Sequence, residues 1–154
     1  MTTSDEENTR QRLAMNTGVV AEFREHGRAS GVFEQVELAV LTVTGARSGE
    51  PRTVPLVCFH DPERAAEDGI FVVASDGGSD RHPAWYRNLS VHPDLTIETV
   101  HGRYRARAGE VSDEAERERL FGVAIAKHPE FASYRAATAR RIPLVTIRLL
   151  EALS

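Results

Sequence analysis

Two strand-like segments around a glycine-rich turn constrain the fold of this chain more than any other feature. Residues Val36 to Thr44 (VELAVLTVT) are rich in β-branched residues and apolar on both faces, which is typical of a central strand covered on two sides. The turn GARSGEPR follows, and Arg52 to His60 (RTVPLVCFH) is the expected returning strand. Pro55 lies inside this second strand, and it predicts an edge or a bulge because proline cannot donate to a sheet ladder.

More strands and helices are expected along the rest of the chain. Strands are predicted at 70–75, 95–100, 103–108 and 143–150, and the middle two can pair through a tight turn at His101-Gly102. Helices are predicted at 11–26 with Gly27 as the stop, at 83–90, from a cap at Ser112, and at 129–139. The regular strand-helix alternation of a parallel sheet is missing. The expected fold class is therefore α+β, mostly antiparallel β, as a small barrel or sandwich with inserted and flanking helices.

Length, charge and composition narrow the functional classes. With 154 residues and a net charge of −4, the chain is expected to be one domain and not a general nucleic-acid binder, which would need a basic surface. The longest apolar run spans residues 70–74, whereas a membrane span needs about 20 residues. Cys58 is the single cysteine, so no internal disulfide can form and a cytoplasmic protein, free or peripheral to the membrane, is expected. Residues 1–12 are polar and are expected to form an arm outside the domain.

The turn after the first strand is a candidate anion site. Gly45 and Gly49 leave backbone N–H groups free, and Arg47 and Arg52 flank them. Backbone N–H groups can form a concave nest for an anion, and arginine adds a forked charge. The same composition also suits an ordinary hairpin loop with solvated arginines. Composition alone leaves both interpretations open.

Two later segments could border a ligand. The strand at 70–75 runs into the sequence Ser-Asp-Gly-Gly at 75–78, which either lets a ligand approach the backbone or is a flexible connector. In the helix after Pro83, Trp85 and Leu89 share a face and are expected in the core. Asn88 lies one turn after Trp85 and could face the same cavity.

Several other chemistries are not favoured by the sequence. The six histidines show no regular ligand spacing, so no metal site is expected, and Cys58 is interpreted as a small buried hydrophobe. Ser75 could in principle join a Ser-His-Asp triad, but no G-x-S-x-G motif surrounds it. The arginines at 103, 105 and 107 are expected on the solvated face of a strand.

Three motifs follow one another in a specific order. They read TGARSGEPRTVPL, ASDGGSDRHPAWYRNL and, near the end, HPEFASYRAATARRIPLV. Each motif is weak alone, but the ordered set resembles the deazaflavin-dependent nitroreductase-like family over residues 16–149. The resemblance implies a split β-barrel, a fold shared with flavin-using pyridoxamine-phosphate oxidases. It further implies that residues 13–154 form a domain that binds the deazaflavin coenzyme F-420.

The resemblance also implies a set of site residues. The anionic tail of the coenzyme would be held by Arg47, Ser48 and Arg52. The strand beside the coenzyme would contribute Thr53, Val54, Pro55, Leu56 and Val57. The deazaflavin ring would be bordered by Val73, Ala74, Ser75 and Asp76 and faced by Ala84, Trp85, Tyr86, Arg87 and Asn88. Phe131 and Tyr134 would cap the acceptor, and the candidate catalytic residues are Ser75 and Tyr134.

By the same resemblance, the chain is expected to be an oxidoreductase that transfers a hydride from reduced F-420 to a quinone, an enone or a similar conjugated acceptor. Two departures from the family are visible. The best-known nitroreducing relative has tyrosines around its acceptor pocket, whereas this chain has Val57, His128 and Phe131 and keeps only Tyr134. Asp76 stands where relatives often carry a cation. Nitroimidazole reduction is therefore not assigned.

Three alternatives remain open from the sequence. The same fold could hold FMN in place of F-420. The protein could bind a deazaflavin or a lipid-like molecule without catalysis, or Ser75 could act in an acyl hydrolase. The partner in the main interpretation is a small-molecule hydride acceptor. The sequence leaves the oligomeric state open between a monomer and a homodimer, although split-barrel relatives are often dimers.

Overall fold

A single antiparallel sheet organises the molecule, as the sequence predicts. The computed structural model describes residues 16–29 and 36–153, so the predicted arm at 1–12 and the start of the first helix lie outside the described residues. The strands are β1 (Leu38–Thr44), β2 (Pro51–Val57), β3 (Phe59–His60), β4 (Ile70–Val73), β5 (Asp94–Thr99), β6 (Gly102–Glu110) and β7 (Leu144–Leu153). Their order across the sheet is β2-β1-β5-β6-β7-β4-β3, and every neighbouring pair is antiparallel.

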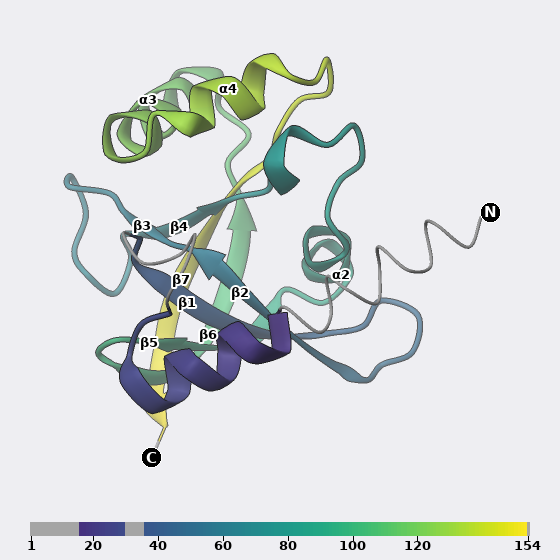
Figure 1. The fold of residues 1–154 in the computed structure, drawn as a ribbon, viewed down its shortest axis with the longest axis vertical. Coiled ribbons are helices and arrows are strands. Elements are labelled where there is room, and N and C mark those ends of the chain that lie inside the picture. Colours follow the sequence, from purple (N-terminus) through teal and green to yellow (C-terminus); the bar gives the residue numbers. More distant parts are fainter. Residues whose placement is uncertain (1–15, 30–35, 154) are drawn as a thin grey trace.

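The two edge strands of this sheet are neighbours in sequence. β2 and β3 lie at opposite ends of the strand order, yet Cys58 alone separates them. The sheet must therefore curl until its two ends meet, which makes the split barrel (Figure 1). The single strand predicted over Arg52 to His60 is thus wrong, because the chain changes edges at Cys58, whose N–H donates to the Glu37 carbonyl at 3.0 Å.

Proline at 55 fits the edge position of β2. β2 pairs with β1 only, with Pro55 opposite Val40, so one side of the strand needs no ladder donors. The hairpin between β5 and β6 is also confirmed, with Thr99 opposite Gly102. Its two turn residues are Val100 and His101, one position earlier than predicted, and Gly102 has the positive φ of 147°.

Helices cover the two ends of the curled sheet. One spans residues 16–26 and stops at Gly27, whose φ is 77° and whose N–H donates to the Phe23 carbonyl. The others are α2 (Ala84–Val91), α3 (Glu114–Lys127) and α4 (Glu130–Ala136). Figure 1 shows α3 and α4 together at one end of the sheet and the helix over residues 16–26 at the other. None of the described helices is long and apolar enough to cross a membrane.

The cap of α3 differs from the expectation by one residue. Asp113, not Ser112, is the N-cap, and its carboxylate accepts the Glu116 N–H at 2.9 Å. A carboxylate reaches this donor and also interacts favourably with the positive end of the helix dipole, which explains the preference. On the apolar face of α3, Leu120, Phe121 and Ala124 are buried, whereas Ile125 is half-buried.

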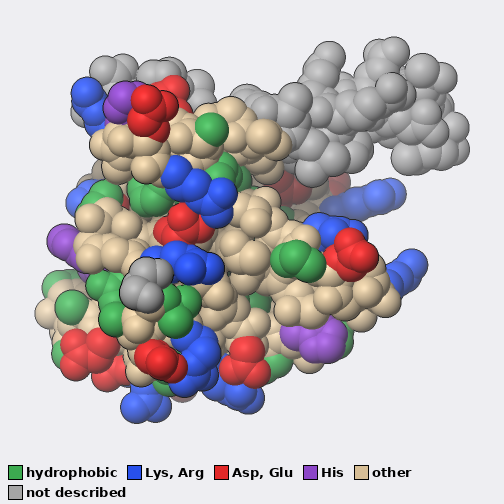
Figure 2. All heavy atoms as spheres, turned by 90° about the horizontal axis from the view of Figure 1, so that it is seen from below, with side chains coloured by type: hydrophobic (Ala, Val, Ile, Leu, Met, Phe, Trp, Pro, Cys, Tyr) green, Lys and Arg blue, Asp and Glu red, His purple; other side chains and the backbone are tan. Residues whose placement is uncertain are grey.

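The apolar residues form separate clusters on the two faces of the curled sheet. One cluster fills the barrel and includes Trp85 and Leu89 from α2, which confirms their predicted core position. A second cluster lies under α3 and α4 and is built around Phe71 and Phe121. Most charged side chains lie outside, and Asp61 and Arg117 are the buried exceptions among the described residues. The surface in Figure 2 shows basic and acidic side chains interspersed, and the predicted arginine face at 103, 105 and 107 is exposed.

Candidate functional site

The glycine turn between β1 and β2 is closed by its own backbone. The Gly45 N–H donates to the Glu50 carbonyl at 2.8 Å, and the Gly49 N–H donates to the Gly45 carbonyl at 2.9 Å. Gly49 has a φ of 72°, which other residues rarely adopt. A Cβ at Gly45 would lie 2.5 Å from the Ser48 hydroxyl oxygen and 3.2 Å from the Glu50 carbonyl oxygen, so a larger residue there would displace the Ser48 side chain. The expectation that these two glycines leave their N–H groups free for an anion is therefore wrong, because both groups donate to carbonyls inside the turn.

The two arginines of this turn are not equally free. Arg47 is exposed and makes no hydrogen bond or ion pair with any residue the structure describes. Arg52 is also exposed, but its guanidinium donates to the Ser48 hydroxyl at 3.4 Å and to the Pro51 carbonyl at 3.3 Å. Ser48 in turn accepts the Glu50 N–H at 3.1 Å. Arg47 is thus available to an anion outright, whereas Arg52 and Ser48 must share their bonds.

One side chain joins this turn to α2. The Asn88 carboxamide oxygen accepts the Ala46 N–H at 3.0 Å, which brings together two motifs that lie 42 residues apart in sequence. Around it on α2, Trp85 points into the core, while Ala84 and Arg87 are exposed. Asn88 is half-buried and therefore fixes the position of the turn relative to the helix.

The residues of β2 divide according to the face they occupy. Thr53 is exposed and its hydroxyl lies 3.2 Å from that of Thr42 on β1. Val54 and Leu56 are half-buried against the barrel core and Pro55 is buried. Val57 packs instead against the second cluster, beneath α3 and α4. The last residue of β2 therefore belongs to a different apolar environment from the rest of the strand.

The end of β4 is buried and leads into a short 3-10 helix, η2 (Asp76–Gly78). Val73, Ala74 and Ser75 are 8%, 0% and 5% exposed, and Ser75 is the residue that precedes η2. Asp76 is half-buried and has a positive φ of 45°, a strained value that aspartate tolerates better than most residues. Ser75 is thus a polar residue held at the boundary of the core.

Gly78 lets α4 pack directly on η2. Its φ is 88°, and a Cβ there would lie 2.9 Å from both the Ala137 Cβ and the Tyr134 carbonyl oxygen. The space that glycine leaves open is therefore filled by α4 and not by a ligand. This contact is what brings Tyr134 next to the segment that follows β4.

Arg140 is a central residue of the site that no sequence motif singles out. Its guanidinium donates to the carbonyls of Ala74 at 3.1 Å, Ser75 at 2.9 Å and Ser79 at 2.7 Å. It also lies 3.0 Å from Nδ1 of His82. A guanidinium has no acceptor, so Nδ1 must accept, which places the hydrogen of the neutral ring on Nε2. Arg140 therefore holds the whole segment from the end of β4 to the start of α2.

No local pattern marked Arg140 in the sequence. It is one of two consecutive arginines before the Ile-Pro that precedes β7, and its neighbour Arg141 is exposed with bonds only to the α3 region. Its partners lie 58 to 66 residues earlier in the chain. Only the folded topology distinguishes the two arginines.

Aromatic side chains from β3, α4 and the residue that ends α3 form one cluster. The Phe131 ring lies edge-on to Phe59 and to Tyr134, with centroids 5.2 Å apart in both pairs, and His128 is 5.8 Å from Phe59. Phe131 is 7% exposed, whereas Tyr134 and Val57 are half-buried at the margin of this cluster. The residues predicted to cap the acceptor are thus brought together into one apolar wall.

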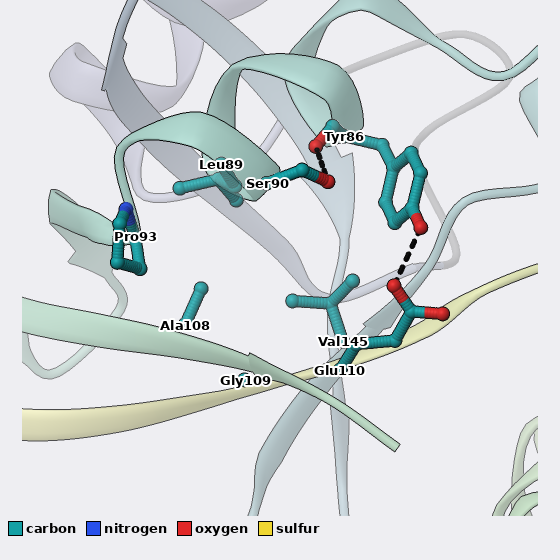
Figure 3. Close-up of a pocket in the computed structure, with 8 residues that line it drawn as sticks. All are labelled: Tyr86, Leu89, Ser90, Pro93, Ala108, Gly109, Glu110 and Val145. Carbon is teal, nitrogen blue, oxygen red and sulfur yellow. Dashed lines mark hydrogen bonds between the residues drawn. The ribbon is translucent and has the colours of Figure 1, made fainter. Parts of the chain in front are cut away.

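Tyr86 turns away from this wall. Its hydroxyl donates to a carboxylate oxygen of Glu110 at 2.5 Å, across a cavity of about 280 Å³ between α2 and strands β6 and β7 (Figure 3). Burial, followed by the Glu110 carboxylate, raises the pKa of Tyr86. Leu89 and Ser90 line the same cavity. Tyr86 therefore belongs to a cavity that is separate from the aromatic cluster of Phe131 and Tyr134.

The chemistry available at Ser75 can now be narrowed. No imidazole or carboxylate of the described residues makes a hydrogen bond to the Ser75 hydroxyl. A serine nucleophile needs a base within hydrogen-bond reach, so the geometry does not favour an acyl hydrolase. The site instead combines exposed cations, fixed backbone turns and an apolar aromatic wall.

The sequence that builds this site matches a known family. The family model for F(420)H(2)-dependent quinone reductase matches residues 15–148 of the chain. The chain belongs to this family. Its members are oxidoreductases that depend on coenzyme F-420, so the family, the enzyme class and the cofactor expected from the sequence are confirmed.

Individual relatives agree with the family match. The chain is 32% identical over 110 residues to an F(420)H(2)-dependent quinone reductase of Mycobacterium tuberculosis, an alignment that covers 70% of each chain. Among solved structures, it is similar to the F(420)-H2 dependent reductase FDR-A, with a TM-score of 0.62 and 32% identity over 72% of this chain and 93% of that one. A second structure, described as a domain-swapped dimer, has a TM-score of 0.63 and 27% identity over 96% of this chain and all of the other.

The split-barrel fold is shared more widely than the function. The heme storage protein HutZ of Vibrio cholerae has a TM-score of 0.56 but only 15% identity over 86% of this chain. At that level the likeness establishes the fold alone. The expected split barrel is therefore confirmed by relatives both inside and outside the family.

Proposed function

We propose that this protein transfers a hydride from reduced F-420 to a quinone, with enones and similar conjugated molecules as further acceptors. The observation that carries the proposal is the joining of three motifs around one segment. Asn88 ties the arginine turn to α2, Arg140 fixes the end of β4, and Gly78 brings α4 against it. The family match over residues 15–148 supports the same assignment.

The residues present fit the chemical groups of the coenzyme. Its tail is anionic, and Arg47 offers an exposed guanidinium with no competing partner among the described residues. Because the whole chain carries a net charge of −4, attraction of an anion must come from such local cations. The ring is flat and largely apolar, and the resemblance places it beside the segment from Val73 to Ser75, whose residues are buried in the free protein.

The bound coenzyme supplies the hydride, and the protein supplies position and polarity. The turn from Gly45 to Arg52 would hold the tail, so that the ring is placed at the end of β4. Phe131 and Tyr134 would cover the acceptor and exclude water, since both belong to the aromatic wall beside that strand end. Excluding water favours transfer to the acceptor over loss of the hydride to solvent.

We assign polar roles at the reacting end to Ser75 and Tyr134. The Ser75 hydroxyl would donate a hydrogen bond near the reacting atoms, because it lies at the core boundary where the ring is expected. Tyr134 is half-buried on α4, whose backbone contacts Gly78, and its hydroxyl would deliver a proton to the reduced acceptor or close over it. Glu110 already accepts the Tyr86 hydroxyl, which leaves Tyr134 as the better donor.

A coenzyme titration followed by turnover assays tests the proposal. Oxidised F-420 is expected to bind with a change in its fluorescence, and more tightly than FMN. Reduced F-420 is then mixed anaerobically with quinones and with enones, and oxidation of the coenzyme is followed by absorbance. Equal or tighter binding of FMN would contradict the coenzyme assignment. Tight F-420 binding without oxidation by any acceptor would show a carrier and not an enzyme.

We also propose a homodimer. The relative described as a domain-swapped dimer, which aligns over 96% of this chain, supports this assembly. Light scattering after size-exclusion chromatography is expected to give twice the chain mass of 17.0 kDa. A monomeric mass across the accessible concentration range would contradict it.

A further inference from the structure

Three metal-ligating side chains converge at the junction between β2 and β3. Glu37 lies just before β1, Cys58 separates the two strands, and His60 ends β3. The Cys58 thiol donates to a Glu37 carboxylate oxygen at 3.3 Å, and Nε2 of His60 lies 2.6 Å from the same oxygen. All three donor atoms are within 4.8 Å of one another. From these positions we propose that Glu37, Cys58 and His60 form a binding site for Zn²⁺ or a similar divalent transition metal.

The local backbone explains why these donors meet. Side chains alternate along an extended segment, so Cys58 and His60 point to one side while Phe59 points to the other. Phe59 accordingly stacks on Phe71 in the second cluster, with ring centroids 5.3 Å apart. The hydrogen bond from the Cys58 N–H to the Glu37 carbonyl, 3.0 Å long, fixes the third donor beside the first two.

The geometry is close to what a tetrahedral metal needs. Zinc bonds of about 2.0–2.3 Å place neighbouring ligand atoms roughly 3.3–3.7 Å apart. The distance from sulfur to oxygen, 3.3 Å, already fits, and the 2.6 Å distance from nitrogen to oxygen must widen by a little under 1 Å. The side chains of His60 and Glu37 are 41% and 29% exposed, so they can adjust, and water can reach a fourth position.

Ligand chemistry and charge favour a borderline-soft dication. A thiolate, an imidazole and a carboxylate together suit Zn²⁺ better than Mg²⁺ or Ca²⁺, which prefer oxygen ligands alone. A dication bound by one thiolate and one carboxylate forms a neutral centre, so no net charge is buried. Lys127 is close enough to act electrostatically on both Glu37 and Cys58, and its charge opposes the metal.

Metal binding at this site must release a proton. In the free protein the Cys58 thiol keeps its proton and donates it to the Glu37 carboxylate. The metal forms a bond to sulfur as the S–H bond breaks, and the proton passes to solvent, while neutral His60 gives a nitrogen lone pair. No electron is transferred.

Spacing along the chain did not predict this site. Cys58 and His60 are two residues apart and Glu37 lies 21 residues before Cys58, a pattern unlike the common zinc motifs. The earlier expectation of no metal site rested on that missing pattern. Barrel closure at Cys58 is what brings the donors together, and closure is a property of the fold.

The proposal is tested with Co²⁺ as a spectroscopic substitute for Zn²⁺. The full chain, free of any affinity tag and stripped with a chelator, is titrated with Co²⁺ in the absence of coenzyme. We expect one Co²⁺ per chain, with a thiolate-to-metal charge-transfer band and the visible bands of a tetrahedral site. Zn²⁺ should displace the Co²⁺ and raise the melting temperature. Absence of the thiolate band would overturn the proposal.

Variants assign the ligands. Cys58→Ala should abolish the charge-transfer band, and His60→Asn should weaken Co²⁺ binding at least about tenfold. His101→Asn is the matched control, because His101 is an exposed histidine in the β5–β6 turn, and it should bind as the parent does. Equal affinity of the parent and His60→Asn, with circular dichroism confirming that both are folded, would also overturn the assignment. The measurement uses no coenzyme, so it stands or falls separately from the proposed reductase activity.

Discussion

Two glycine-rich segments of this chain look alike in sequence and differ in the folded molecule. The turn after β1 remains exposed and carries Arg47, which has no partner among the residues the structure describes. The segment after β4 is covered by α4 at Gly78 and held by Arg140. Glycine content therefore does not indicate whether a loop is open to a ligand. What decides it is the element that packs against the loop.

The comparison also separates two roles of arginine. Arg47 faces solvent and is available for binding, whereas Arg140 donates to backbone carbonyls and to His82 and is structural. We accordingly expect substitutions in the first segment to alter coenzyme affinity with little change in stability. Substitutions that disturb the packing of the second segment, at Gly78 or at Arg140, should alter stability first and catalysis as a consequence.

The largest effect is expected from Arg140→Met. The substitution keeps the apolar stem but leaves the carbonyls of Ala74, Ser75 and Ser79 without their donor, so we expect a loss of about 3–4 kcal/mol in the free energy of unfolding. Urea denaturation measures it. Arg141→Met is the matched control and should cost under about 1 kcal/mol, because Arg141 is exposed. Similar losses in the two variants would refute the structural role of Arg140.

Alanine at glycine positions tests the packing difference directly. Gly78→Ala combines an unfavourable φ with a clash against the backbone of Tyr134 and should cost about 3 kcal/mol. Gly49→Ala has a similar φ but open space around it, so about 1 kcal/mol is expected. Denaturation midpoints at an unchanged m-value give both numbers. If Gly49→Ala proved the more damaging, the two segments would not differ as described.

Removing an arginine from the exposed turn should weaken coenzyme binding. A charge-assisted hydrogen bond contributes about 1.5–3 kcal/mol, so Arg47→Ala is expected to lower F-420 affinity roughly 10- to 150-fold. Arg52→Ala should do less, since Arg52 also bonds Ser48 and Pro51. Fluorescence titration measures affinity, and Arg103→Ala on β6 is the control. If Arg47→Ala bound F-420 within about twofold of the parent, the turn would not be part of the coenzyme site.

The smallest effect concerns Ser75→Ala. The hydroxyl is expected to act on the reacting end of the coenzyme, so turnover should fall about fivefold, near 1 kcal/mol, with little change in F-420 affinity. Single-turnover oxidation of bound, reduced F-420 isolates this step. An unchanged rate constant would show that the Ser75 hydroxyl takes no part in the reaction and that Ser75 only borders the coenzyme.

Local patterns predicted most of the elements and fewer of the connections. Apolar alternation and turn residues gave the hairpins, and the edge position of β2 followed from Pro55. The break at Cys58 was missed because Arg52 to His60 is uniformly strand-like, and only the meeting of the sheet edges interrupts it. The same limit applies to Asn88 and Arg140. Both residues lie in motifs that the sequence shows, but their hydrogen-bond partners lie more than 40 positions away and could not be identified from local patterns.

The junction at Cys58 has a consequence for how this protein behaves among its neighbours in a concentrated solution. The edge of a sheet is a row of unpaired donors and acceptors that can recruit a strand from another chain. Here one residue holds both edges of a seven-stranded sheet together, so each edge partly screens the other. A few residues inserted on either side of Cys58 would let the edges part. The expected symptom is aggregation during expression, well before any change in the arrangement of the helices.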